Sequence, residues 1–255
     1  MSIIQCFGFF FFAVLLMVQN CFAAEIAMQP VSVSIQDKVR LQRGAKLFMN
    51  YCSGCHSLRY MRYNRIAEDL GLVDFSGQVD ENLLRNLIFT KVTPYEPVQI
   101  AMPLDDAKQW FGIIPPDLSL IAREKGADWL YHYLKSFYND NSRPFGVNNL
   151  LVPNVAMPNI LEPLMGQQAL VVDNESHRES LLLVKHGEML PIDFDSSLRD
   201  LVTFLVYVGE PVQLTRRKLG IFVVLFLSLL FIVVYFLNKI YWRHLKDCHP
   251  KRSKG

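Results

Sequence analysis

Apolar side chains at helical spacing mark three segments of the chain. The first precedes residue 52 and contains small or apolar residues three or four positions apart: Leu41, Gly44, Ala45 and Phe48. The second is predicted over about Asp128–Phe137, with Asp128 as N-cap. The third is predicted over Ser197–Val208, with Ser197 as N-cap and Gly209 at its end. We therefore expect three helices in this part of the chain.

These helices predict a mainly α fold, because alternating strand patterns are scarce. Long loops are expected at residues 74–109, 94–116, 144–163 and 167–191, and prolines and asparagines recur in two of these stretches. Loops of this length in a compact domain commonly serve a site or enclose a large ligand. On the first helix we expect Gly44 and Phe48 to meet Phe204 or Tyr207 of the last helix.

The N-terminal end of the chain is hydrophobic. Apolar residues run almost without interruption over residues 7–18, and small residues follow up to Ala24. This pattern predicts a secretory signal at residues 1–24, cleaved near Ala23 or Ala24. No Lys or Arg precedes the stretch, so an uncleaved N-terminal anchor stays open as the alternative.

The C-terminal hydrophobic stretch is longer. Residues 219–237 contain no charged side chain, and as a helix they would be about 28 Å long, which matches the hydrocarbon core of a bilayer. We expect a transmembrane anchor at residues 216–240 and a basic tail at residues 241–255. Three basic residues precede the span and six follow it, which favours a cytoplasmic C-terminus.

Charge is distributed unevenly along the chain. The whole sequence has a formal net charge of +2. Between residues 25 and 215, however, 17 Lys or Arg stand against 23 Asp or Glu, which leaves a net charge of −6. An acidic exported domain argues against nucleic acid as a partner and favours a basic protein.

Only two of the five cysteines fall within the predicted exported domain. They belong to Cys52-Ser53-Gly54-Cys55-His56, which has the spacing of a c-type haem attachment site. Two thiols one helical turn apart can both form thioethers with the haem vinyl groups, and the adjacent His56 then supplies a nitrogen to the iron. We therefore predict one covalently bound haem c that transfers single electrons.

Two other uses of a cysteine pair compete with haem. A thioredoxin-like redox pair lies at the start of a helix after a buried strand, and no βαβ pattern surrounds Cys52. A structural zinc site takes four ligands, commonly from two cysteine pairs, and the exported domain has one pair. Covalent haem is favoured, and thiol–disulfide exchange is the alternative from a different functional class.

The second axial ligand is less defined. His/Met ligation suits an electron carrier because Met raises the potential of the iron. Met157 lies in the stiff segment Pro153–Pro158. It is one of seven candidate methionines: Met28, Met49, Met61, Met102, Met157, Met165 and Met189. A bis-His site would instead use His132, His177 or His186, and spacing alone leaves the choice open.

Three segments resemble, in order and spacing, those of the cytochrome c1 family, the haem-bearing subunits of ubiquinol–cytochrome c reductase (cytochrome bc1) complexes. Residues 51–60, Tyr-Cys-Ser-Gly-Cys-His-Ser-Leu-Arg-Tyr, are similar to the haem-attachment region. Residues 114–119, Ile-Pro-Pro-Asp-Leu-Ser, resemble the proline-containing segment of the haem pocket, and residues 154–158, Asn-Val-Ala-Met-Pro, the axial-methionine segment. A single C-terminal anchor preceded by Arg-Arg-Lys completes a resemblance that spans nearly the whole chain.

The resemblance implies how the haem would be held. Cys52 and Cys55 would attach it, with His56 as proximal and Met157 as distal ligand of the iron.

It also implies contacts to the ring and its edge. Pro115 and Pro116 would pack against the ring. Members of the family hold a haem propionate with an Arg shortly after the Pro-Pro-Asp-Leu segment, where this chain has Arg123 and Lys125, with Lys125 closest to that position. A Lys neutralises a propionate but lacks the two-pronged geometry of Arg.

The fold implied is a class I cytochrome c-like haem domain with extended loops, residues 25–215, plus one C-terminal transmembrane helix. Electrons would arrive from a Rieske iron–sulfur subunit associated with cytochrome b and leave to a cytochrome c. The chain itself, an electron-carrier subunit of a quinol:cytochrome c oxidoreductase, changes no substrate bond. It would lie in the lipid of a bacterial inner (cytoplasmic) membrane, with its haem domain in the periplasm. An anchored cytochrome that serves a terminal oxidase or shuttles alone is the rival within the same class.

Overall fold

In the computed structural model of the protein, residues 28–87, 93–100, 102–172 and 179–247 are described. The predicted signal at residues 1–24 therefore lies outside the described residues, as do His177 and the end of the basic tail. Regular structure in the described residues is mostly helical, which confirms the predicted mainly α fold.

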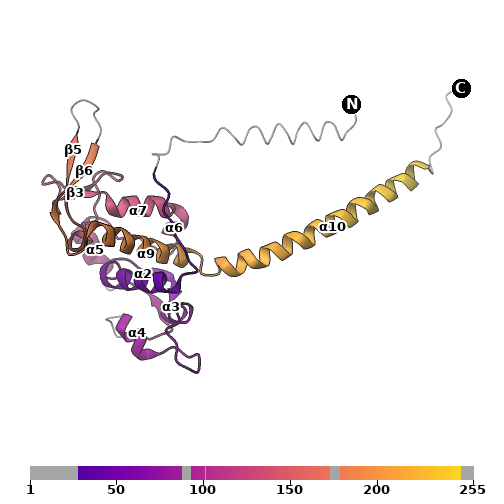
Figure 1. The fold of residues 1–255 in the computed structure, drawn as a ribbon, viewed down its shortest axis with the longest axis horizontal. Helices are drawn as coiled ribbons and strands as arrows, with labels where there is room; N and C mark the ends of the chain where they lie inside the picture. Colours follow the sequence, from indigo (N-terminus) through magenta and orange to yellow (C-terminus); the bar gives the residue numbers. More distant parts are fainter. Residues whose placement is uncertain (1–27, 88–92, 101, 173–178, 248–255) are drawn as a thin grey trace.

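Short helices and strands alternate along the chain before two long helices end it (Figure 1). In chain order the elements are α2 (Lys38–Tyr51), β1 (Leu58–Arg62), α3 (Tyr63–Leu70), α4 (Glu81–Leu87), β2 (Pro97–Val98), α5 (Leu104–Phe111), α6 (Ile121–Glu124), α7 (Ala127–Lys135), β3 (Phe137–Asn139), β4 (Val147–Asn149), α8 (Glu162–Met165), β5 (Gly166–Val172), β6 (Glu179–His186), α9 (Pro191–Gly209) and α10 (Gln213–Asp247).

The core forms where α2 lies against α9 (Figure 1). Gly44 makes this approach close, since a Cβ added there would stand 2.1 Å from the Asp200 carbonyl oxygen and 2.8 Å from Phe204 Cβ. The rings of Phe48 and Phe204, both fully buried, lie 5.7 Å apart between centroids. The expected contact between the first and last helices of the domain is confirmed.

A buried carboxylate ties the same two helices together. Asp200 on α9 is 1% exposed, and its Oδ2 accepts from Arg43 Nε on α2 at 2.6 Å. Its Oδ1 faces Arg40 Nε at 3.4 Å and has no hydrogen-bond partner among the described residues. The hydrogen bond to Asp200, opposed in part by burial, raises the pKa of the Arg43 guanidinium, so the guanidinium stays charged.

Two helix boundaries differ from the prediction. The helix expected over residues 197–208 begins at Pro191, because Leu190 is extended and a proline at the first helical position is already suited to a helix start. The helix expected from Asp128 begins one residue earlier and ends before Phe137, which opens β3. Asp128 is not the N-cap; its Oδ1 instead accepts from the Val31 N–H at 2.6 Å. This hydrogen bond fixes the segment that precedes α2.

Several of the strands, although not β1 and β3, occur where loops were expected. The described residues contain three antiparallel pairs, β1–β2, β3–β4 and β5–β6. The longest, β5–β6, starts one residue before the expected loop at 167–191 and runs from Gly166 opposite His186 to Val172 opposite Glu179. Hydrophobic residues alternate poorly on β6, where Leu182 and Val184 are both about 60% exposed, so the usual sign of a half-buried strand is weak there.

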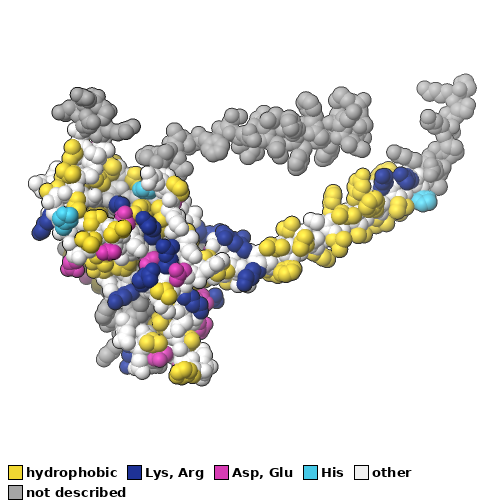
Figure 2. All heavy atoms as spheres, viewed as in Figure 1, with side chains coloured by type: hydrophobic (Ala, Val, Ile, Leu, Met, Phe, Trp, Pro, Cys, Tyr) yellow, Lys and Arg dark blue, Asp and Glu magenta, His cyan; other side chains and the backbone are white. Residues whose placement is uncertain are grey.

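The last helix, α10, leaves the domain as a single long rod (Figure 1). Its stretch Gln213–Leu245 is the one helix among the described residues that is long and apolar enough to cross a membrane, and none of its most apolar window is buried. Figure 2 shows hydrophobic side chains along its middle and Lys or Arg at both ends. This is the pattern of a membrane-spanning helix, with basic residues at the two interfaces.

Candidate haem site

The cysteine motif follows directly from the end of α2. Cys52 is the C-cap residue, and its N–H donates to the Phe48 carbonyl oxygen at 2.8 Å. A tight turn comes next, in which the N–H groups of Cys55 and His56 both donate to the Cys52 carbonyl oxygen, at 3.0 and 2.8 Å. Cys52 is 7% exposed and Cys55 is half-buried. A thioredoxin-like pair would instead lie at the start of a helix, so the motif is in the wrong place for that alternative.

His56 is buried and held in one orientation. Its Nδ1 lies 2.7 Å from the Pro116 carbonyl oxygen, and because a carbonyl only accepts, Nδ1 carries the proton. The proton on Nδ1 leaves Nε2 as the nitrogen with a free lone pair, as in histidines that ligate metals. Burial lowers the pKa of the His56 imidazole, against smaller opposing effects of Pro116 and Asp117, so the ring is neutral at neutral pH.

The segment at residues 115–119 is docked onto the motif by a second set of hydrogen bonds. Asp117 Oδ2 accepts from the Ser57 hydroxyl at 2.7 Å and from the Arg59 N–H at 2.9 Å. The Leu118 N–H donates to the Ser57 carbonyl oxygen at 2.9 Å. Burial alone would raise the pKa of Asp117, but the hydrogen bonds from Ser119, Arg59 and Ser57 together lower it. Asp117 is therefore ionised and fixes the carbonyl that orients His56.

The two prolines of this segment differ in exposure. Pro115 is half-buried, whereas Pro116 is exposed and supplies the carbonyl to His56. Their contact with a haem ring stays a prediction.

The thiols themselves are unsuited to redox exchange. Burial, with a smaller effect of Cys55, raises the pKa of Cys52 to about 12, and burial also raises the pKa of Cys55. Thiols that exchange disulfides have pKa values below the ordinary range, because the thiolate is the reactive form. The site therefore favours a buried thioether over a working dithiol.

Met157 lies on a loop between β4 and α8, where it is half-buried and packs against the core. The Tyr133 hydroxyl donates to its sulfur at 3.5 Å. The Tyr133 ring is stacked on Trp129 at 4.9 Å between centroids, and burial raises the pKa of Tyr133 to about 12, so it stays a neutral donor. Tyr133, stacked on Trp129, is therefore the α7 residue that contacts the Met157 thioether.

The rival ligands have other surroundings. Met49, Met61 and Met165 are buried in the core, whereas Met28, Met102 and Met189 are half-buried. His132 is half-buried and its Nε2 lies 3.1 Å from the Gln29 carbonyl oxygen, and His186 is exposed at the end of β6. Of the three rival histidines, His177 lies outside the described residues.

The two basic residues expected near a propionate both have carboxylate partners. Arg123 Nη1 lies 3.2 Å from Glu210 Oε2. Lys125 Nζ lies 3.0 Å from Glu124 Oε1 and 5.8 Å from the centre of the Trp129 ring. Their role toward a propionate stays a prediction.

Polar residues that the sequence reasoning missed shape the Met157 loop. Asn149 is fully buried, and its Oδ1 accepts from the N–H groups of Leu151 and Val152 at 2.9 and 3.1 Å. Asn148 Oδ1 accepts from the Asn154 N–H at 2.8 Å. Asparagine side chains that accept from backbone N–H groups a few residues further along the chain are typical of turns. The Asn148–Asn149 pair before Pro153 could therefore have indicated a turn held by asparagine side chains.

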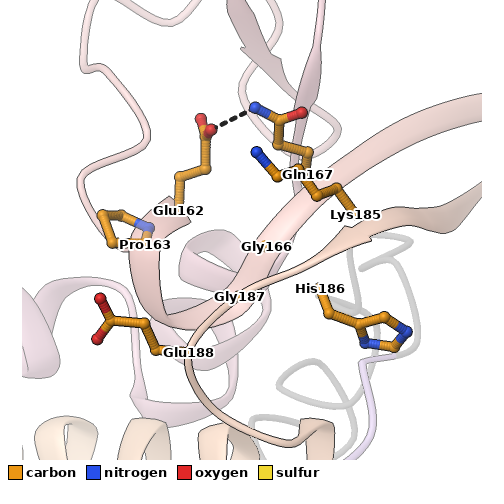
Figure 3. Close-up of a pocket in the computed structure, with 8 residues that line it drawn as sticks. All are labelled: Glu162, Pro163, Gly166, Gln167, Lys185, His186, Gly187 and Glu188. Atoms are coloured by element: carbon orange, nitrogen blue, oxygen red, sulfur yellow. Dashed lines mark hydrogen bonds between the residues drawn. The ribbon is translucent and has the colours of Figure 1, made fainter.

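A cleft of about 350 Å³ lies at the base of the β5–β6 hairpin and not at the haem motif (Figure 3). Its lining is Glu162, Pro163, Gly166, Gln167, Lys185, His186, Gly187 and Glu188. In Figure 3 the amide of Gln167 donates to the Glu162 carboxylate, at 2.7 Å. Glycines at the point where the hairpin meets α8 shape this cleft, and none of the predicted haem residues lines it.

The residues of the motif fit a covalent haem. Two neutral thiols stand three positions apart, an imidazole with a fixed proton on Nδ1 follows at once, and a thioether sulfur is held on a separate loop. Two thiols, one imidazole and one thioether are the donor set of a c-type cytochrome. Together with the apolar helix α10, they define the class of protein as a membrane-associated c-type cytochrome.

Comparison with known proteins makes this class more specific. The model of the cytochrome C1 family matches residues 31–245. The chain is 47% identical over 229 residues to cytochrome c1 of Allochromatium vinosum, covering 87% of this chain and 90% of that protein. It is 41% identical over 221 residues to a Nitrosomonas europaea protein described as an ammonia monooxygenase gamma subunit, with the same coverage. A chain of a solved hyperthermophilic respiratory complex III gives a TM-score of 0.42 at 15% identity, covering 94% of this chain and 99% of that one.

The protein belongs to the cytochrome c1 family, which confirms the resemblance found in its sequence. Membership implies a haem c, a part in electron transport, and a place as the electron-transfer subunit of a bc1 complex with cytochrome b and Rieske subunits.

Proposed function

We propose that this chain holds one haem c through thioethers to Cys52 and Cys55, with His56 and Met157 as axial ligands, and that it passes single electrons from a Rieske iron–sulfur protein to a cytochrome c. The observation that carries the proposal is the His56 imidazole, buried beside two neutral thiols and fixed by the Pro116 carbonyl at 2.7 Å. A haem bound in this way supplies an iron that alternates between ferrous and ferric states.

The residues of the chain set the properties of that iron. The hydrogen bond from Nδ1 to a carbonyl makes the imidazole a better donor and prevents it from rotating. Met157 ligation and a buried, apolar environment both favour the ferrous state, which gives a positive potential. No bond of a substrate has to be made or broken by side chains of this chain.

The proposed topology places the haem domain, residues 25–215, in the periplasm of a bacterial inner membrane. Residues 216–240 span the lipid, and residues 241–255 lie in the cytoplasm. The excess of basic residues after the apolar stretch supports this orientation, and so does the need to attach haem to an exported domain. A reporter fused to the C-terminus should be active only on the cytoplasmic side; periplasmic activity would reverse the proposed topology.

The acidic character of residues 25–215 supports a basic electron acceptor, because opposite charges steer transient partners together. If this is right, the rate of electron transfer to a basic cytochrome c falls as ionic strength rises. A rate that does not depend on salt would remove the electrostatic argument for that acceptor.

The first test is a reduced-minus-oxidised visible spectrum of the protein purified from its own membranes in mild detergent. Bands of one c haem together with about two b haems are expected for a bc1 complex. A c band alone would favour an anchored shuttle. Complete absence of a haem band would refute the proposal.

Covalent attachment is tested separately, by haem staining after a denaturing gel. Only thioether-bound haem stays with the chain under these conditions. We expect staining of the native chain and its loss in a Cys52→Ala, Cys55→Ala double variant. Equal staining of the two chains would contradict attachment at these cysteines.

A further inference from the structure

Arg143 holds the loop that carries Met157. It lies in the turn between β3 and β4, and its Nη1 and Nη2 donate to Asn154 Oδ1 and the Asn154 carbonyl oxygen at 3.0 and 3.1 Å. Both terminal nitrogens of the guanidinium therefore donate to one residue, three positions before Met157. Only an Arg offers two parallel donors in such a rigid fork.

Asn154 has a backbone that needs this support. Its φ is +63°, the one positive value for a residue other than glycine among the described residues. A left-handed backbone at a non-glycine position persists when its surroundings impose it. Here the Asn154 N–H also donates to Asn148 Oδ1, and Asn148 Nδ2 donates to Asp140 Oδ2 at 3.0 Å. Arg143 and Asn148 together set the direction in which the chain runs on to Met157.

The third nitrogen of the guanidinium is unsatisfied. Arg143 Nε is buried and has no hydrogen-bond partner among the described residues. A buried donor without an acceptor is costly, and native proteins rarely leave one unpaired. The charged group beside Arg143 is Asp140, whose pKa is lowered by hydrogen bonds from Ser142 and Asn148 and, less strongly, by Arg143 itself. Asp140 does not bond Nε, and Nε has almost no accessible surface, so the hold on the loop comes from the two terminal nitrogens.

We propose that Arg143 is a positioning residue for the second axial ligand: its two terminal nitrogens hold the segment that leads to Met157. This inference rests on the proposed haem c and its ligation by Met157. Arg143 would then fix the direction of the loop that supplies the ligand, through Asn154, three positions before Met157.

Two substitutions separate the two hydrogen bonds to Asn154 from the positive charge of Arg143. Arg143→Lys keeps the positive charge and loses the fork, whereas Arg143→Gln loses both. Arg62→Lys is the matched control, since Arg62 also donates through Nη1 to a backbone carbonyl, that of Tyr95, but lies on the exposed surface of β1. Each full-length chain is purified from its own membranes, and three quantities are measured: covalent haem per chain, midpoint potential, and the red absorption band of ferric Met-ligated haem.

Both Arg143 variants should keep covalent haem, weaken the Met band, and favour the ferric state at least tenfold, which is about 59 mV in midpoint potential for one electron. A weakened Met band with the covalent haem retained separates this positioning role from a general loss of folding.

Asn154→Gly is a second test that does not depend on whether the Arg143 variants fold. Glycine suits the positive φ, and the substitution removes only the side-chain oxygen that accepts from Arg143 Nη1. The midpoint potential should therefore fall, as in the Arg143 variants, but by a smaller amount. Potentials and Met bands of both Arg143 variants equal to those of Arg62→Lys would overturn the inference. Native protein without covalent haem, or an unchanged potential in Met157→Ala, would instead refute the proposed function.

Discussion

At the scale of single residues, the orientation of His56 depends on a segment 60 positions away in the chain. The Pro116 carbonyl fixes the proton of the imidazole, and Asp117 fixes the position of Pro116 by accepting from Ser57 and Arg59. The residue types of the Cys-x-x-Cys-His motif predict the chemistry. The partner of the imidazole, however, could not be named from spacing, because a backbone carbonyl has no signature in the sequence.

Met157→Ala tests the second axial ligand. The variant should keep its covalent haem, because the thioethers are elsewhere, but favour the ferric state at least a hundredfold, about 120 mV at 59 mV per tenfold. Potentiometric titration of the purified protein measures this shift. Met189→Ala, at another half-buried methionine, should leave the potential unchanged. A shift in Met189→Ala and none in Met157→Ala would move the ligand assignment.

Asp117→Asn tests the hydrogen-bonded carboxylate. The pKa of Asp117 is lower in the folded protein than its ordinary value of 3.8, so its stabilising effect is fully present above that value and is lost as the pH falls through the folded pKa. At pH 7 the variant should be less stable by about 1–2 kcal/mol, from the weakened hydrogen bonds. Thermal or denaturant unfolding from pH 7 down to pH 3 should show the difference shrinking. A constant difference at all pH values would contradict an ionised Asp117.

At the scale of elements, the pairing of α2 with α9 is the packing contact that the sequence predicted best. Small and aromatic residues at helical spacing indicated both the helices and the faces that meet. The start of α9 at Pro191 was missed, because Ser197 is by its chemistry a better N-cap than Leu190. The proline at the first helical position and the burial of Phe194, 4% exposed, instead go with the longer helix. The β5–β6 hairpin was missed because both faces of β6 are largely exposed.

Gly44→Ala tests that packing. The added methyl would overlap the Asp200 carbonyl oxygen, since its ideal position is 2.1 Å from that atom, and the two helices would have to separate. We expect a loss of at least about 2 kcal/mol in the free energy of unfolding, measured in denaturant. Val39→Ala is the control, because Val39 lies on the same helix and its side chain is 57% exposed. Equal stability of the two variants would show that α2 and α9 are not closely packed at Gly44.

At the scale of the whole molecule, a helical domain rich in loops is joined to a long apolar helix (Figures 1 and 2). Glu210 marks the junction of α9 and α10, where its carboxylate contacts both Arg123 and Arg216. Arg123 belongs to α6, next to the segment that orients His56, so this acidic residue connects the haem side of the domain with the start of the membrane helix.

Removal of residues 213–255 tests the independence of the domain. Apolar side chains of α10 are exposed in the structure, so the domain should not need them for its core. The shortened chain should move from the membrane to the soluble fraction and keep the haem spectrum of the full chain. Fractionation of cells followed by haem staining checks this. Loss of haem, or retention in the membrane, would show that α10 supports the domain or that another segment anchors it.

The sequence by itself determined the class of haem, the mainly helical fold, the apolar C-terminal helix and the family, because each depends on local spacing, hydrophobic length or residue order. Only the tertiary structure decided which atoms hold the key side chains: the Pro116 carbonyl on His56, the Tyr133 hydroxyl on Met157, and Arg143 on the loop before Met157. These contacts join residues 11 to 60 positions apart. The physical reason is that hydrogen bonds to backbone carbonyls and loop asparagines depend on where the chain returns in space, and no local pattern of residue types records that.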